Sequence, residues 1–223
     1  MRNLILGASL LLTTIVSASA TAADVEHSFQ RVVNRGSVKR ILIDIPAGSF
    51  TIRNGSATQL ALAGIVSRDF DGAKERAWAQ KVVNDTTVEF YVNGADAVVR
   101  RKFGPNAQSW RAQKFSGVDL RLDLPPGVSV EFETTAGEVD MAGNFGDIDI
   151  DMRAGEVDLR IPRATVRELS ASCRVGEVRT NLGTELVTRE GLFPGATKFK
   201  NASGKSHVNV HVTAGEVDVT LTQ

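Results

Sequence analysis

Ala136-Gly137-Glu138-Val139-Asp140-Met141 is the first of four related hexapeptides in the second half of the chain. The others are Ala154-Gly155-Glu156-Val157-Asp158-Leu159, Val175-Gly176-Glu177-Val178-Arg179-Thr180 and Ala214-Gly215-Glu216-Val217-Asp218-Val219. Successive glycines are 18, 21 and 39 residues apart, and Gly195 lies near the middle of the last interval, where we expect a further unit. A turn glycine followed by a short strand about every twenty residues is typical of stacked repeats.

The repeat also predicts which side chains form the core. A valine stands two places after each glycine and is expected to face inward. The residue three places before each glycine is also expected to face inward. These inward residues are Val139, Val157, Val178 and Val217, together with Thr134, Met152, Cys173 and Val212. Cys173 is therefore interpreted as a core residue rather than a nucleophile, because a free cysteine packs as a small hydrophobe. Units stacked about 4.8 Å apart would share an interior that one unit cannot make alone.

Elsewhere, short runs alternate between apolar and polar residues, which predicts strands with one buried face. The runs are 41–45, 48–52, 60–66, 88–92, 118–124 and 128–133. Only 71–83 is typical of a helix, with Asp71 as its N-cap and Ala77, Trp78 and Val82 as its apolar stripe. We expect this helix to cover one end or one face of the strands.

Composition and the N-terminus restrict the class of protein. The 223 residues include 26 basic and 26 acidic ones, a balance that argues against nucleic-acid binding. A single cysteine excludes an internal disulfide and a cysteine-rich zinc site. Residues 1–22 combine Arg2, the apolar run 4–16 and small residues at 18–22, which predicts a signal peptide and no transmembrane segment after its cleavage. We therefore expect an exported protein, either periplasmic or secreted to the cell surface.

The run Val118 to Val130, followed by 135–140, resembles a bacterial β-strand-repeat family whose members are named putative adhesins. Segments 43–52 and 212–219 resemble the first and last strands of that family, so the resemblance covers most of the mature chain. It implies a right-handed parallel β-solenoid without a catalytic motif; a β-sandwich is the alternative. We expect one domain over 23–223. Its N-terminal strands (24–116) include the helix 71–83 and a basic loop at 100–114, and its repeat region is 117–223.

An acidic column follows the turn glycines. Its members are Glu138, Glu156, Glu177 and Glu216. Stacked in register they would lie roughly 5 Å apart, so a calcium-bridged ladder is one interpretation. A solvated face neutralised by arginines is the other, with Arg153, Arg160, Arg174 and Arg179 as the neutralising residues. We favour the solvated face, because the calcium-binding G-G-x-G-x-D nonapeptide is absent.

A second group of candidate binding residues mixes cations with aromatic rings. It comprises Arg100, Arg101, Lys102, Trp110, Arg111 and Lys114. Such a group can bind an anionic polymer, a lipid headgroup or a sugar through charge pairing and stacking. The alternative is that these long side chains only cover apolar strands while their charges stay in water.

Catalysis has little support in the sequence. Glu133, Asp149 and Asp151 are the best acid–base set, but a glycosidase needs two carboxylates that face one cleft. His207 and His211 are separated by roughly 13 Å of strand, too far to share a metal, and His27 is isolated.

The main hypothesis is a non-catalytic, adhesin-like binding or structural module of the cell envelope. It needs no cofactor, and its partner is an unidentified envelope polymer or protein. The alternatives are a scaffold that self-associates through an exposed terminal strand edge near Leu221, and a polysaccharide-active enzyme.

Overall fold

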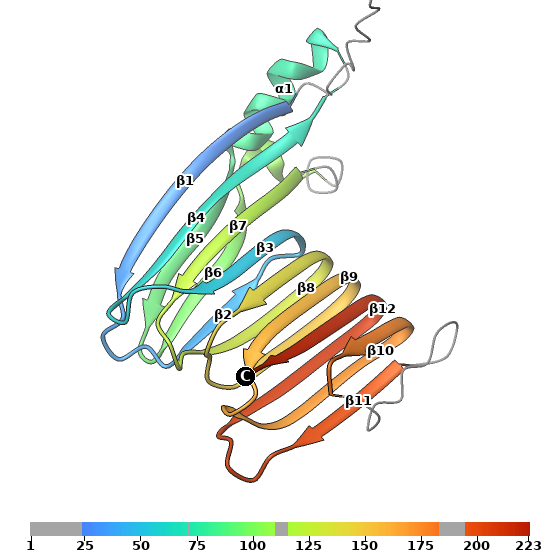
Figure 1. Cartoon of the computed structure of the whole chain (residues 1–223). Coiled ribbons are helices and arrows are strands. Elements are labelled where there is room, and N and C mark those ends of the chain that lie inside the picture. Colours follow the sequence, from blue (N-terminus) through green and yellow to red (C-terminus); the bar gives the residue numbers. More distant parts are fainter. Residues whose placement is uncertain (1–23, 71, 110–115, 183–194) are drawn as a thin grey trace, which may run out of the picture.

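The computed structural model describes residues 24–70, 72–109, 116–182 and 195–223 (Figure 1). The predicted signal peptide, 1–22, lies outside these residues. The first half contains β1 (Asp24–Asn34), β2 (Arg40–Asp44), β3 (Ala47–Asn54), β4 (Gln59–Asp69), α1 (Ala73–Asn84), β5 (Thr86–Asn93), β6 (Asp96–Phe103) and a short 3-10 helix (Pro105–Ala107). The second half contains β7 (Ser116–Leu124), β8 (Ser129–Ala142), β9 (Ile148–Pro162), β10 (Val166–Thr180), β11 (Gly195–Lys200) and β12 (Ser206–Thr222).

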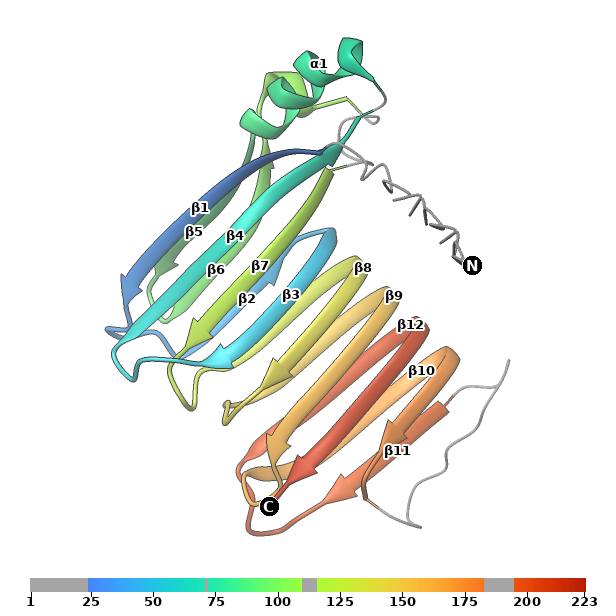
Figure 2. The same cartoon turned by 45° about the horizontal axis from the view of Figure 1, so that its top comes forward.

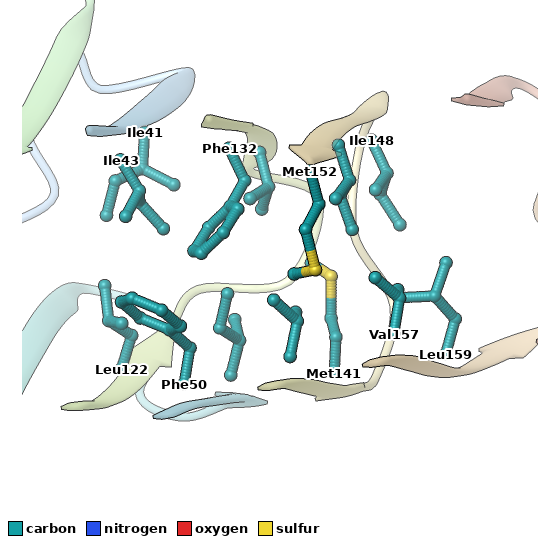
Figure 3. Close-up of a cluster of buried hydrophobic side chains, with 14 of the residues drawn as sticks. Ile41, Ile43, Phe50, Leu122, Phe132, Met141, Ile148, Met152, Val157 and Leu159 are labelled. Carbon is teal, nitrogen blue, oxygen red and sulfur yellow. The ribbon is translucent and has the colours of Figure 1, made fainter. Parts of the chain in front are cut away.

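The long strands of the repeat region bend in the middle and contribute to two facing layers. In β8, Phe132 is buried before the bend and Met141 after it. Figure 3 shows Met152 of β9 and Met141 of β8 pointing toward each other from opposite layers. Each strand thereby supplies side chains to both sides of one continuous apolar core.

The repeat glycines occupy the bend and lie beside one another. The register pairs Gly48 with Gly137, Gly137 with Gly155, Gly155 with Gly215, and Gly215 with Gly176. A Cβ atom on Gly155 would lie 1.8 Å from the carbonyl oxygen of Gly137, and Gly155 has a φ of +135°. Only glycine fits such a contact, because no side chain is compatible with either the space or the backbone angle. The column of glycines therefore lets neighbouring backbones approach closely at the bend.

The inward repeat positions are buried, as their spacing implies. The valines after the glycines, Val139, Val157, Val178 and Val217, are at most 2% exposed. Cys173 is fully buried, and its thiol contacts the carbonyl oxygen of Gly215 at 3.1 Å. Burial raises the pKa of this thiol, which suits a packing role better than that of a thiolate nucleophile.

The predicted right-handed parallel β-solenoid is wrong. The strands form one mixed sheet in the order β1-β4-β7-β3-β8-β9-β12-β10-β11, with β2 joining β6 to β8 and β5 pairing with β6. The sheet contains antiparallel pairs, and β12 lies between β9 and β10 instead of following β10. A closed coil needs each unit to lie on the one before it, and this order breaks that rule. The sandwich-like alternative describes the bent, two-layered sheet better (Figure 1).

Two further expectations about the C-terminal part are also wrong. The unit expected at Gly195 is the short strand β11, which runs antiparallel to β10 although Thr197 and Phe199 are buried. The terminal strand β12 pairs on both sides, with β9 and with β10. The pairing with β10 ends at Val219, and beyond it the Asn181 side chain accepts a hydrogen bond from the Leu221 N–H and donates one to its carbonyl oxygen, so the expected uncapped edge is not found there.

The helix covers one end of the layers, next to β1 and β4 (Figure 2). It begins at Ala73 with Gly72 as the N-cap, and Asp71, the predicted N-cap, lies outside the described residues. Its buried residues are Ala79, Val82 and Val83, while Ala77 is exposed and Trp78 is half-buried. Among the described residues, no helix is long and apolar enough to cross a membrane.

Candidate binding surfaces

The hairpin of β5 and β6 brings two of the predicted cationic residues together. Arg100 and Lys102 alternate along β6 and both project outward, where they meet Glu89 of β5. Glu89 accepts hydrogen bonds from Arg100 Nε at 2.7 Å and from Lys102 Nζ at 3.0 Å. The Arg100 guanidinium, and after it the Lys102 ammonium, hold the pKa of Glu89 below its usual value. The carboxylate thus fixes two cations on one surface.

Arg101 does not belong to this surface, which corrects the predicted group. The pleat turns alternate residues to opposite faces, so Arg101 points inward and lies 4.6 Å from the ring of Phe103. Burial lowers its pKa. The other predicted members, Trp110, Arg111 and Lys114, lie outside the described residues.

Tyr91 is a surface residue that the sequence analysis missed. Its side chain is 39% exposed, and its ring lies 5.7 Å from the Arg100 guanidinium. The signal was present at Gly94, because a two-residue turn at Gly94-Ala95 sets the register that places Tyr91 on the same face as Glu89 and Arg100. We call the outward side chains Thr87, Glu89, Tyr91, Arg100 and Lys102 the hairpin face.

A cleft of about 530 Å³ opens along the outer side of β5. Arg31 of β1 forms one wall, and Phe90, Tyr91 and Arg100 line the other. The cleft separates the edge strand of one layer from the edge strand of the other, and in Figures 1 and 2 β5 lies behind β1 and β4.

The acidic column is aligned across neighbouring strands, and arginines neutralise much of it. The register places Glu138, Glu156, Glu216 and Glu177 side by side. Arg179 lies 2.6 Å from Glu177, 3.1 Å from Glu216 and 3.7 Å from Asp218. The described residues contain no group of three or more His, Cys, Asp or Glu side chains that could hold a metal ion.

The neutralising arginines differ in part from those expected. Arg160 pairs with Asp158 and Asp140, and Arg53, which the sequence analysis did not single out, also pairs with Asp140. Arg153 and Arg174 make no ion pair with a described carboxylate. Burial raises the pKa of Asp218, and the nearby Arg179 opposes that rise.

Replacing Arg179 with alanine is expected to lower the melting temperature by a few degrees at neutral pH. The variant leaves Glu177, Glu216 and Asp218 facing one another without a cation, and like charges on neighbouring strands repel. The loss should shrink as the pH falls through the carboxylate range, because protonated carboxyls no longer repel. Circular dichroism melting at several pH values measures this. Arg174→Ala, on the same strand and without an ion pair to a described carboxylate, is the control; equal losses in both variants would contradict the explanation.

The residues considered for catalysis do not form one site. Glu133 and Asp151 are neighbours on the outer face, beside a hollow of about 150 Å³, but Asp149 occupies the next outward position and accepts a hydrogen bond from Asn209. His211 Nδ1 lies 3.1 Å from the Ser172 hydroxyl. His207 lies 3.5 Å from Asp147, and His27 is on β1. The three carboxylates therefore do not face a common cleft.

Comparison with known proteins identifies similar folds only. No family model and no curated protein matches the chain. A solved structure named "putative cell adhesion protein", from Clostridium sporogenes, has a TM-score of 0.50 and 12% identity, covering 89% of this chain and all of the other. A "putative adhesin" from Parabacteroides distasonis has a TM-score of 0.34 and 10% identity, covering 86% of this chain and 70% of the other. Identity this low shows that the fold resembles that of a protein named for cell adhesion, and nothing about its ligand.

Proposed function

We propose that the chain is a non-catalytic, exported binding module of the cell envelope, and that its hairpin face holds an anionic polymer. One observation carries the proposal: Arg100 and Lys102 stand on a single surface with one carboxylate between them and an exposed tyrosine ring beside them. The predicted signal peptide and the fold shared with a protein named for cell adhesion support an envelope location.

The chemistry of the hairpin face suits a polymer with regularly spaced negative charges. The two cations can pair with carboxylate, sulfate or phosphate groups, and the Tyr91 ring offers a flat surface for a sugar ring. Because Glu89 already holds both cations in place, binding would not have to order two long flexible side chains. The binding is expected to weaken with salt, since exposed charges are screened over about 10 Å at 0.1 M ionic strength.

The double variant Arg100→Ser/Lys102→Ser is expected to bind anionic surfaces more weakly. A cation near such a surface contributes about 1 kcal/mol, so losing two should weaken binding roughly thirtyfold. The probes are purified cell-wall sacculi, polygalacturonate, and vesicles with and without phosphatidylglycerol, measured by co-sedimentation. These probes distinguish a glycan from a lipid headgroup as the source of the negative charge.

Two matched variants test the assignment of the site. Lys198→Ser/Lys200→Ser removes two cations from β11 and should bind like the wild type. Glu89→Gln removes the only carboxylate of the hairpin face and should strengthen binding. Equal binding by the wild type and Arg100→Ser/Lys102→Ser on every probe would refute the proposed function.

A further inference from the structure

The two ends of the layered sheet have unlike edges. Among the residues that the structure describes, β1 pairs only with β4 and β5 only with β6, so at one end each layer finishes in a strand with a single described neighbour. Phe29 and Val33 of β1 and Phe90 of β5 are partly buried side chains packed against the core. We call the edges of β1 and β5 with these side chains the open end.

The edge of β1 has charges at Asp24, Glu26 and Arg31 but lacks the other features that keep edge strands from pairing. It is 11 residues long, contains no proline or lysine, and pairs with β4 without a break in register from Asp24 to Asn34. Alternate N–H and C=O groups along its outer side are therefore directed away from β4 in an extended row. Natural proteins usually interrupt such a row with a charge, a proline, a bulge or a covering segment.

The opposite end is protected. Its edge strand β11 has only six residues and carries Lys198 and Lys200 facing outward. The second half of β10, whose one described partner is β12, carries the exposed cations Arg174 and Arg179. Short, lysine-bearing edges discourage the addition of another strand.

Exposed apolar side chains gather at the open end. Among the described residues, five large hydrophobic side chains are markedly exposed, and four of them lie on β1, β4 and β5. These four are Val32 at 51%, Ile65 at 36%, Tyr91 at 39% and Val92 at 42%. The fifth, Val175 at 45%, is on β10 at the protected end. Val32 and Ile65 lie on the outer face of one layer and Tyr91 on the outer face of the other, so apolar side chains flank both strand edges, as is typical of interaction surfaces.

We propose that the open end binds a second copy of this chain, so that β1 and β5 of each copy meet those of the other across a two-fold axis. A single extended peptide could pair with β1 or with β5, but it would leave the edge of the other layer uncovered. A second copy has its own β1 and β5 edges, separated by the same distance between layers, so it can cover both edges of the first copy. The cleft of about 530 Å³ between Arg31 and Tyr91 would lie within this contact.

The size of the open end suits a stable dimer. Eleven residues of extended strand span about 37 Å, and two layers about 10 Å apart with their side chains present a depth of roughly 20 Å. The contact would then bury roughly 700 Å² on each copy, or about 1,400 Å² in total, within the range of stable protein interfaces. Tyr91 and Arg100 of the hairpin face also line this cleft, so the dimer would bring two hairpin faces together and cover part of each.

The test compares a charge at the open end with the same charge elsewhere. Val32→Lys/Val92→Lys places two lysines at the open end of each copy, so the two-fold axis brings four new positive charges into one contact. Val175→Lys places one on a valine of similar exposure at the protected end. Sedimentation equilibrium should give a dimer for the mature wild type and for Val175→Lys. The open-end variant should dissociate about a hundredfold or more readily, because like charges at an interface repel. Circular dichroism melting should show all three folded.

Backbone amide exchange gives a second measurement. Exchange in β1 and β5 should slow as the wild-type concentration rises, whereas exchange in the centrally placed β12 should not change with concentration. A wild type that stays monomeric at every soluble concentration would overturn the proposal, as would an open-end variant that dimerises as well as Val175→Lys. Slow exchange of β1 and β5 at all concentrations would also overturn it, because another part of the same chain would then cover the edges.

Discussion

Gly155→Ala is expected to prevent the repeat region from folding, with a loss of about 4 kcal/mol or more from the 5–15 kcal/mol that stabilise a typical domain. The new Cβ would lie 1.8 Å from the Gly137 carbonyl oxygen, and alanine rarely adopts the φ of +135° found at this position. The blocking atom belongs to the backbone of a paired neighbour, so it cannot move without breaking the strand pairing. Urea denaturation followed by circular dichroism measures the loss.

Gly94→Ala separates two causes of the destabilisation expected at Gly155, the close approach of the neighbouring backbone and the positive φ. Gly94 also has a positive φ, +65°, but nothing lies within 4 Å of the position its Cβ would take. Alanine there should cost only about 1 kcal/mol, the usual penalty for a left-handed residue with a side chain. If Gly94→Ala and Gly155→Ala were equally destabilising, the explanation of the glycine column by close approach would fail.

Phe132→Ala is expected to cost about 3–5 kcal/mol, the usual range for truncating a buried aromatic residue. Phe132 is 1% exposed, and its ring packs edge-to-face against Phe50 with centroids 4.7 Å apart. It is also flanked in register by Ile43 of β2 and Ile150 of β9, so its removal leaves a cavity where the two halves of the sheet meet. Figure 3 shows this ring between the two layers. Denaturation with urea gives the change in the free energy of unfolding.

Tyr91→Ala is the matched control for this prediction, since it truncates an aromatic side chain that is 39% exposed. Its loss should stay below about 1 kcal/mol, as for most surface substitutions. A loss for Phe132→Ala as small as that for Tyr91→Ala would show that the two layers are not packed together as described.

The sequence was sufficient to predict a change of chain direction at the repeat glycines and the buried positions of the repeat, but not that the glycines lie within continuous strands, nor the order of those strands. A glycine with a valine two places later forces the same local bend wherever it occurs, so Gly137 and Gly155 were recognisable. The order of the strands in the sheet could not be predicted in the same way. All copies of the repeat share one pattern, so any copy fits beside any other. The 39-residue interval before Gly215 accommodates β11, which runs antiparallel along β10, and β12 then pairs with both β9 and β10. Repeat spacing along the chain contains no information about that choice.

The candidate site could be predicted from the sequence only where the alternation of side chains between the two faces of a strand was taken into account. Arg100, Arg101 and Lys102 are adjacent cations and were therefore predicted as one group. The pleat of the strand turns Arg101 to the face opposite the other two. Tyr91 was missed because it lies nine residues before Arg100 and joins it only through the hairpin register. The open end could not be predicted at all, since a strand becomes an edge only when every other pairing is known.

Paired cysteines on the outer face test the strand order most directly. In the register, Asp149 of β9 is next to Asn209 of β12, which is next to Ser170 of β10. Neighbouring strands lie about 4.8 Å apart, within the range a disulfide spans, and strands two places apart do not. Under mild oxidation, Asp149→Cys/Asn209→Cys should form the disulfide and Asp149→Cys/Ser170→Cys should not, with the buried Cys173 taking no part. The reverse result would place β9 directly beside β10 and contradict the structure described above.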